Sequence, residues 1–141
     1  MIPLVEVNYL AIIVAAIVGT IIGALWYGVI FSKPWMRLHG FDKLAKSELD
    51  KMKKKGHKSM IGHFIVLLII GYALAHMLAY AQVATIAESI IGAVWIWFGF
   101  MATVIFGAVL WEKMPIKLYV INAAHYLVVL AVMAVIITAW V

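Results

Sequence analysis

The stretch that decides the fold is residues 61–82, IGHFIVLLIIGYALAHMLAYAQ, which contains no Lys, Arg, Asp or Glu. A helix needs about 20 mostly apolar residues to cross the hydrocarbon layer of a bilayer, which is about 30 Å thick. The stretch has that length, and a helix pairs its backbone N–H and C=O groups within its own segment, as lipid requires. It therefore predicts a transmembrane helix.

Three further stretches share this length and this lack of charge: residues 8–31, 89–110 and 118–141. The chain of 141 residues is 67% hydrophobic with a mean hydropathy of +1.12, well above the roughly half-apolar composition of soluble domains. We therefore predict an all-α, polytopic membrane protein. Its four transmembrane helices form a single domain over residues 1–141.

Basic residues are confined to two of the three connections between these helices. Residues 32–60 hold nine of the eleven Lys and Arg residues, and Lys113 and Lys117 in the tight third connection are the others. Because cytoplasmic loops carry the excess of Lys and Arg, we expect both connections in the cytoplasm and the N-terminus and C-terminus outside. The predicted location is the cell membrane, as a multi-pass protein of a prokaryotic plasma membrane.

A single cysteine at position 54 tests this orientation. The Lys54→Cys thiol is expected to be shielded from an impermeant thiol reagent in intact cells and to react after lysis. Because the chain has no other cysteine, the signal comes from this position alone. Labelling in intact cells contradicts the predicted orientation.

The long first connection carries a helical pattern of its own. Apolar residues recur at spacings of three to four between Asp42, which can cap a helix, and Gly56, which can end one. We predict a short amphipathic helix over residues 43–55 that lies in the membrane interface and brings lysines to anionic lipid headgroups. These lysines are Lys51, Lys53, Lys54, Lys55 and Lys58. A solvated loop that only sets topology, and a docking site for a protein partner, are the alternatives.

Several classes of function are excluded by what the sequence lacks. With no cysteine, the chain has no disulfide framework, zinc–thiolate site or cysteine nucleophile. The net charge of +5 is confined to membrane connections, so we expect no nucleic-acid partner. A phosphate-binding loop, a nucleophile elbow, an HExxH motif and a haem-attachment motif are all missing. We therefore expect no catalytic residues, no cofactor and no enzymatic activity.

Small residues recur along three of the predicted helices, where they let helix backbones approach one another closely. The positions expected to pack in this way are Gly19, Gly23, Gly71, Ala75, Gly99 and Gly107. Packing within one bundle and packing between protomers are both open. We expect a homo-oligomer, because four short helices enclose little volume alone and assembly with copies of itself is the usual way in which so small a bundle creates a pathway.

Polar side chains at membrane depth are costly unless they are paired, and they are the first place to look for a site. The rise of about 1.5 Å per residue along a helix sorts them into two layers. The inner layer consists of Trp26, Tyr27, His63, Asn122, His125 and Tyr126. In the outer layer, Tyr72 and His76 lie on one helix face and are expected to turn toward the interior of the bundle.

Each layer has a structural and a functional interpretation. Interhelical hydrogen bonds of about 0.6–2 kcal/mol each are enough to explain both layers, whereas proton coupling through His125 or His76 is the functional alternative. A metal site is not expected, because it needs three or four convergent ligands and only His63 and His125 share a layer.

Several short motifs recur in a known family. They are Asn8-Tyr9, Gly23-x-Leu25-Trp26-Tyr27, Phe31, Trp35, Trp97-x-Gly99-Phe100, Ile121-Asn122, Tyr126 and Trp140. Over nearly the whole chain they resemble small membrane proteins of the family called domain of unknown function 1761. The resemblance implies a four-helix membrane domain and supplies no activity, substrate or cofactor.

Two hypotheses of function follow. The first is a homo-oligomeric transporter or channel-like protein, whose interior, lined by the polar residues, binds or passes a small solute. The chain resembles four-helix multidrug exporters in length, but it lacks the glutamate that they carry inside their first helix. The second is a structural or accessory membrane protein that organises a partner through its basic loop.

Overall fold

The structure is a computed structural model that describes residues 4–140. In chain order its elements are α1 (Tyr9–Leu25), the π-helix η1 (Trp26–Ile30), α2 (Ser32–Leu38), the 3-10 helix η2 (Phe41–Lys43), α3 (Lys46–Tyr80), α4 (Ile86–Ile96), the π-helix η3 (Trp97–Ala102), α5 (Thr103–Trp111) and α6 (Ile116–Ala139). The described residues contain no strand, so the predicted all-α class is confirmed.

Four helical stretches are long and apolar enough to cross a membrane: Tyr9–Ile30, Lys46–Tyr80, Ile86–Trp111 and Ile116–Ala139. The predicted number of spans is confirmed, and the largest difference in bounds is at the start of the second. The fourth helix was expected to run to residue 141, which lies outside the described residues.

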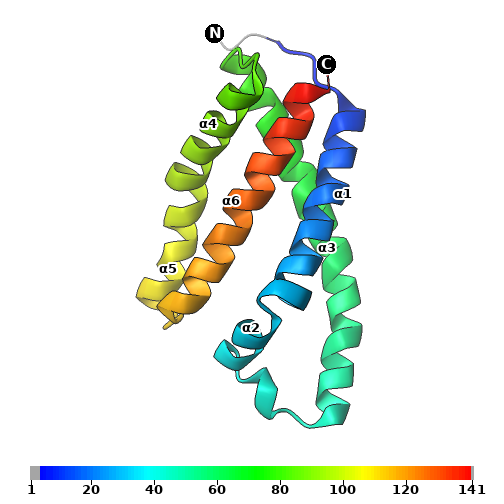
Figure 1. Ribbon diagram of the computed structural model, residues 1–141, viewed down its shortest axis with the longest axis vertical. Coiled ribbons are helices and arrows are strands. Elements are labelled where there is room, and N and C mark those ends of the chain that lie inside the picture. The colour runs from blue at the N-terminus through cyan, green and yellow to red at the C-terminus, as the bar shows by residue number, and fades with distance from the viewer. Residues whose placement is uncertain (1–3, 141) are drawn as a thin grey trace.

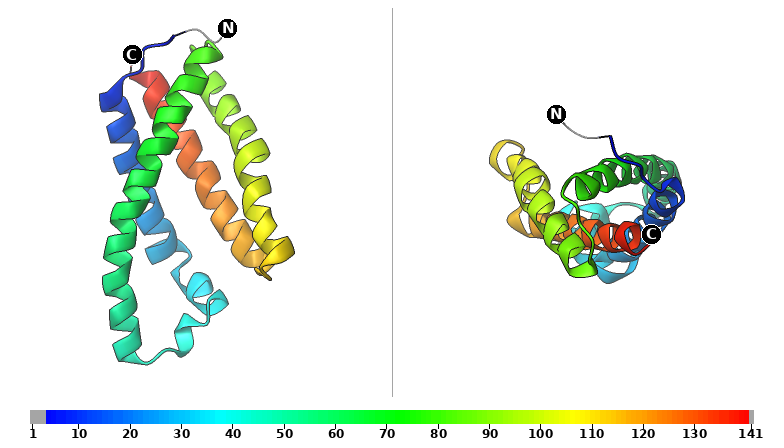
Figure 2. Two further views of the ribbon diagram at one scale, coloured as in Figure 1. Left: turned by 180° about the vertical axis from the view of Figure 1, so that it is seen from behind. Right: turned by 90° about the horizontal axis from the view of Figure 1, so that it is seen from above.

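Helix α6 occupies the middle of the bundle. It packs against α1 and α3 on one side and against α4, η3 and α5 on the other, as Figure 1 and the view from above in Figure 2 show. Helices α3 and α4 touch only sparingly, and they diverge away from the turn that joins them (Figure 2). The buried core lies where α1, α3 and α6 meet.

The two ends of the bundle differ in what they hold. The terminal end contains both ends of the described chain and the turn at residues 81–85, and the basic end contains residues 31–60 and the turn at residues 112–115 (Figure 1). All eleven Lys and Arg residues belong to the basic end or, in the case of Lys117, to the first turn of α6 beside it.

The prediction of a separate amphipathic helix over residues 43–55 is wrong. Helix α3 begins at Lys46, after an extended Ala45, and runs for 35 residues through Gly56 into the apolar span. Asp42 belongs to η2 and does not cap it. A glycine in a helix interior costs only about 1 kcal/mol relative to alanine, and no proline interrupts residues 46–80, so the helix continues.

Because α3 is continuous, the lysines predicted for the loop lie on a helix. Residues 46–60 extend α3 by about 22 Å beyond its apolar part at the rise of a helix, as the lower end of α3 in Figure 1 shows. The five lysines expected at lipid headgroups are all exposed on this extension. Lys58 is closest to the apolar span, whereas Lys51 is two turns further from it.

The turn at the terminal end is fixed by local hydrogen bonds. Gln82 takes a left-handed conformation with φ 56° and ends the run of α3. The Thr85 hydroxyl accepts a hydrogen bond from the Glu88 backbone N–H, and the Glu88 carboxylate accepts from the backbone N–H groups of Ala84 and Thr85. This capping box starts α4 and satisfies its first donors.

Candidate functional site

His125 lies on the buried face of α6 and is only 1% exposed. Neither of its ring nitrogens has a hydrogen-bond partner among residues 4–140. An unpaired polar group in a protein interior costs about 1–3 kcal/mol, and each such group calls for an explanation. His125 is therefore the starting point for a functional site.

The histidine cluster consists of His125 and the side chains gathered around it: Trp26 and Tyr27 of η1, His63 of α3, and Asn122 and Tyr126 of α6. The ring centroid of His125 lies 4.8 Å from that of Tyr126, 5.0 Å from Tyr27, 5.7 Å from His63 and 6.2 Å from Trp26. The structure thus brings together all six residues that the sequence assigned to one inner layer.

Two members of the cluster are fixed by hydrogen bonds to α6. The Tyr27 hydroxyl donates to Asn122 Oδ1 at 2.8 Å, and the Trp26 indole Nε1 donates to the carbonyl oxygen of Ile121 at 3.0 Å. The side chains of His63, His125 and Tyr126 make no hydrogen bond within the described part of the chain. The cluster therefore has a fixed side, formed by Trp26, Tyr27 and Asn122, and an uncommitted side without hydrogen bonds, formed by His63, His125 and Tyr126.

Gly23 of α1 lies opposite the uncommitted side. A Cβ built on Gly23 would stand 3.2 Å from Nε2 of His125 and 3.3 Å from Nε2 of His63. The two nitrogens belong to α6 and α3, and the glycine backbone belongs to α1. Three helices therefore meet at this position. A residue larger than glycine at position 23 would press against both imidazoles, so the glycine lets the backbone of α1 pack closely against His63 and His125.

The cluster contains no charged side chain, and its polar atoms can both donate and accept. A neutral imidazole carries one donor and one acceptor nitrogen, and a tyrosine hydroxyl does both. Residues 4–140 hold no group of three or more His, Cys, Asp or Glu side chains arranged to bind a metal ion. The chemistry present suits a small polar species that both gives and receives hydrogen bonds.

Helix α2 closes the histidine cluster on the side of the basic end. The Trp35 ring packs edge-on against Tyr27 with centroids 5.9 Å apart, and it also contacts His39 and Phe41 at 4.7 and 5.4 Å. Desolvation among these rings lowers the pKa of His39, which lies outside the apolar spans. These aromatic side chains cover the histidine cluster. They belong to α2 and its surroundings, where η1 precedes the helix and Gly40, in a left-handed conformation, follows it.

A layer without polar side chains closes the cluster toward the terminal end. The Met133 side chain lies between α1 and α3, with Cε 3.1 Å from the position of a Cβ on Gly71 and Sδ 3.5 Å from that on Gly19. Leu67 Cδ1 approaches the Gly19 position to 2.9 Å. Leu67 and Met133 are both fully buried, so apolar side chains fill the space between α1, α3 and α6 at this level.

The predicted outer layer is not assembled inside the bundle. Tyr72 is 48% exposed, and its ring stacks on the exposed Tyr9, so the expectation that it turns inward is wrong. His76 is half-buried and donates through Nδ1 to the carbonyl oxygen of Tyr72. Each successive residue of a helix is rotated by about 100°, which places Tyr72 outside the buried face of Gly71 and Ala75.

The expected packing glycines divide into two groups. Gly19, Gly23 and Gly71 lie against other helices, as the distances above show. At Gly99 and Gly107, no described atom lies within 4 Å of an added Cβ, so the packing predicted for them is not made within this chain. Gly99 belongs to η3 and Gly107 to α5, and outside their own span both segments pack mainly against α6.

The two π-helical segments form a feature that the sequence did not predict. Each begins with a tryptophan whose indole Nε1 donates to α6: Trp26 to Ile121, and Trp97 to the carbonyl oxygen of Ala123 at 2.7 Å. π-Helical turns are frequent at functional sites. The sequence pattern that could have indicated these segments is a tryptophan followed by an aromatic residue and a glycine, which occurs at both positions.

Comparison with known proteins gives one match. The profile of a family described as "Protein of unknown function (DUF1761)" matches residues 10–138. No curated protein and no solved structure matches the chain.

Proposed function

We propose that this chain, which belongs to the DUF1761 family of unknown function, is a membrane transporter. It binds a small polar solute at the histidine cluster and passes it across the membrane. The observation that carries this proposal is His125, which is buried with both ring nitrogens unpaired. Polar groups inside a membrane are costly and mark solute or proton pathways. The neighbouring imidazole of His63 supplies a second polar contact, and a solute would bind between the imidazoles and the backbone of Gly23 once these side chains move apart.

The surroundings of the cluster fit a transporter in a closed state. Helix α2 with Trp35 covers the cluster on one side, and the layer of Gly19, Gly71 and Met133 separates it from the terminal end. In the orientation that the basic residues favour, the basic end is cytoplasmic. Movement of α2 would then open the cluster to the cytoplasm, and a change in packing around Met133 would open it to the outside.

A homo-oligomer is part of this proposal. The span formed by α4, η3 and α5 is the least buried of the four, and Gly99 and Gly107 have room for a close neighbour. In membranes, small residues on an open helix face favour association of helices.

Flux measurements in liposomes test the proposal. Protons are followed with an internal pH dye, and water and glycerol by light scattering. We expect protein-dependent flux of at least one of these probes. The flux should fall roughly tenfold in His125→Phe, because the loss of one hydrogen bond of about 1–1.5 kcal/mol to a passing solute changes a rate by about that factor.

The matched control is His76→Phe, which changes a histidine outside the cluster. Its flux should equal that of the unaltered protein. Absence of protein-dependent flux for all three probes contradicts the proposal, and so does an equal loss in both variants.

A second function is favoured by the exposed extension of α3. Residues 46–60 form a helix that is mostly solvent-exposed and rich in lysine, which suits contact with an acidic surface. As an accessory protein, the chain would capture a different protein in crosslinking from positions 53–55. Capture of this chain alone would count against that function.

A further inference from the structure

A cavity of about 720 Å³ opens at the terminal end of the bundle, away from the histidine cluster. It lies between the segment that precedes α1, the ends of α3 and α6, and the turn after α3. Most of its lining is apolar, including Leu78, Val83 and Ile137. Its size falls within the range of about 300–1,000 Å³ that is typical of small-molecule sites.

Three polar side chains line the cavity: Glu6, Asn8 and Thr138. Asn8 is already committed, because its Oδ1 accepts from the Ala11 backbone N–H at 3.1 Å and its Nδ2 donates to the Trp140 carbonyl oxygen at 3.3 Å. These bonds tie the start of α1 to the end of α6 and hold the cavity wall. Neither the Glu6 carboxylate nor the Thr138 hydroxyl makes a hydrogen bond within residues 4–140, so both can serve a ligand.

Glu6 gives the cavity a negative charge that no basic side chain balances. The sequence has no Lys or Arg in residues 1–32, 59–112 or 118–141, which include every segment that lines the cavity. The other acidic residue of this end, Glu88, accepts hydrogen bonds in the capping box of α4 and does not line the cavity. Charge complementarity therefore favours a positively charged ligand.

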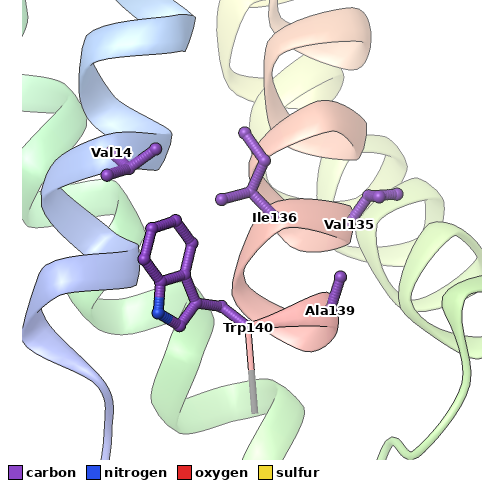
Figure 3. A pocket seen from close by; sticks show the side chains of 5 residues that line it. All are labelled: Val14, Val135, Ile136, Ala139 and Trp140. Atoms are coloured by element: carbon purple, nitrogen blue, oxygen red, sulfur yellow. The ribbon is translucent and has the colours of Figure 1, made fainter.

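Trp140 adds an aromatic residue to the lining. It lines the cavity and also an adjoining hollow of about 500 Å³, where it lies beside Val14 of α1 and Ile136 of α6 (Figure 3). That hollow has no charged residue in its lining. Indole rings can attract cations, and a lining that combines Glu6, Trp140 and several apolar residues suits a cation that carries apolar groups.

We propose that this cavity is a binding site for a lipophilic organic cation. The positive centre of the ligand lies beside Glu6, and its apolar groups pack against Leu78, Ile137 and Trp140. This inference goes beyond the proposed passage of a polar solute through the histidine cluster, because it concerns another end of the molecule and does not require transport.

Two probes of the same shape and opposite charge test the site. The protein, embedded in nanodiscs of neutral phosphatidylcholine, is equilibrated by dialysis with tetraphenylphosphonium or tetraphenylborate, and empty nanodiscs give the partitioning into lipid. We expect saturable binding of tetraphenylphosphonium above this baseline and none of tetraphenylborate.

Two matched variants locate the binding. Glu6→Gln should weaken the affinity for tetraphenylphosphonium about two- to fivefold through loss of one exposed charge pair. Glu88→Gln, which keeps a side chain able to form the capping box, should leave it unchanged. Ala79→Trp, which fills the cavity, should abolish binding. Equal binding of both probes, or an unchanged affinity in Glu6→Gln, overturns the proposal.

Discussion

Replacement of Met133 by alanine is expected to lower the free energy of unfolding by about 2 kcal/mol or more. Met133 is fully buried, and its side chain fills the space beside the bare backbones of Gly19 and Gly71. Shortening it leaves a cavity that neither glycine can fill. Inside a membrane the loss comes mainly from van der Waals packing, because lipid is as apolar as the bundle core.

Unfolding titrations in mixed micelles measure this effect. Met77→Ala is the matched control, because Met77 is 44% exposed on the surface of α3, and its free energy of unfolding should change by less than about 0.5 kcal/mol. Equal values for the two variants would show that the layer around Met133 is not the tightly packed barrier described above.

Replacement of His125 by phenylalanine is expected to act in the opposite direction and raise the free energy of unfolding by about 1–3 kcal/mol. Phenylalanine keeps an aromatic ring against Tyr27 and Tyr126, while it removes two buried nitrogens that have no partner in the described structure. The cost of burying such unpaired groups disappears with them. A gain in stability on removal of His125 is what the proposed binding role predicts, because departures from local rules are expected at functional sites.

Much of the fold could be predicted from the sequence because the physical rule is simple. Each apolar run is long enough to span a bilayer, and the four spans follow from length and the absence of charge. The extension of α3 could not be predicted in the same way. Glycine often ends a helix, so Gly56 suggested a break. A glycine lowers the stability of a long helix only a little, however, and whether the helix continues depends on the residues around it.

Part of the candidate site could also be predicted, because depth follows from the rise per residue. The six residues of the histidine cluster were assigned to one layer by counting along three helices, and they meet in the structure. Counting gives depth but not rotation about the helix axis. Rotation is set by packing, which explains why Tyr72 was assigned to the interior and lies outside it.

The finer geometry of the site depends on contacts that no single segment contains. The approach of both imidazoles to Gly23 requires α1, α3 and α6 to be in place together. The same holds for Trp35, which reaches Tyr27 only because η1 and α2 fold back beneath the cluster. The π-helical turns begin at Trp26 and Trp97, and the indole hydrogen bonds of both residues to α6 likewise join segments far apart in the sequence.

The central claim is that His125 is an unsatisfied group kept for a ligand and is not a packing element. The most direct test compares the free energy of unfolding of the unaltered protein with that of His125→Phe in the same mixed micelles. The account predicts that the variant is more stable by about 1–3 kcal/mol. A variant that is less stable than the unaltered protein would contradict the claim, because it would show that the imidazole makes favourable bonds in the folded state.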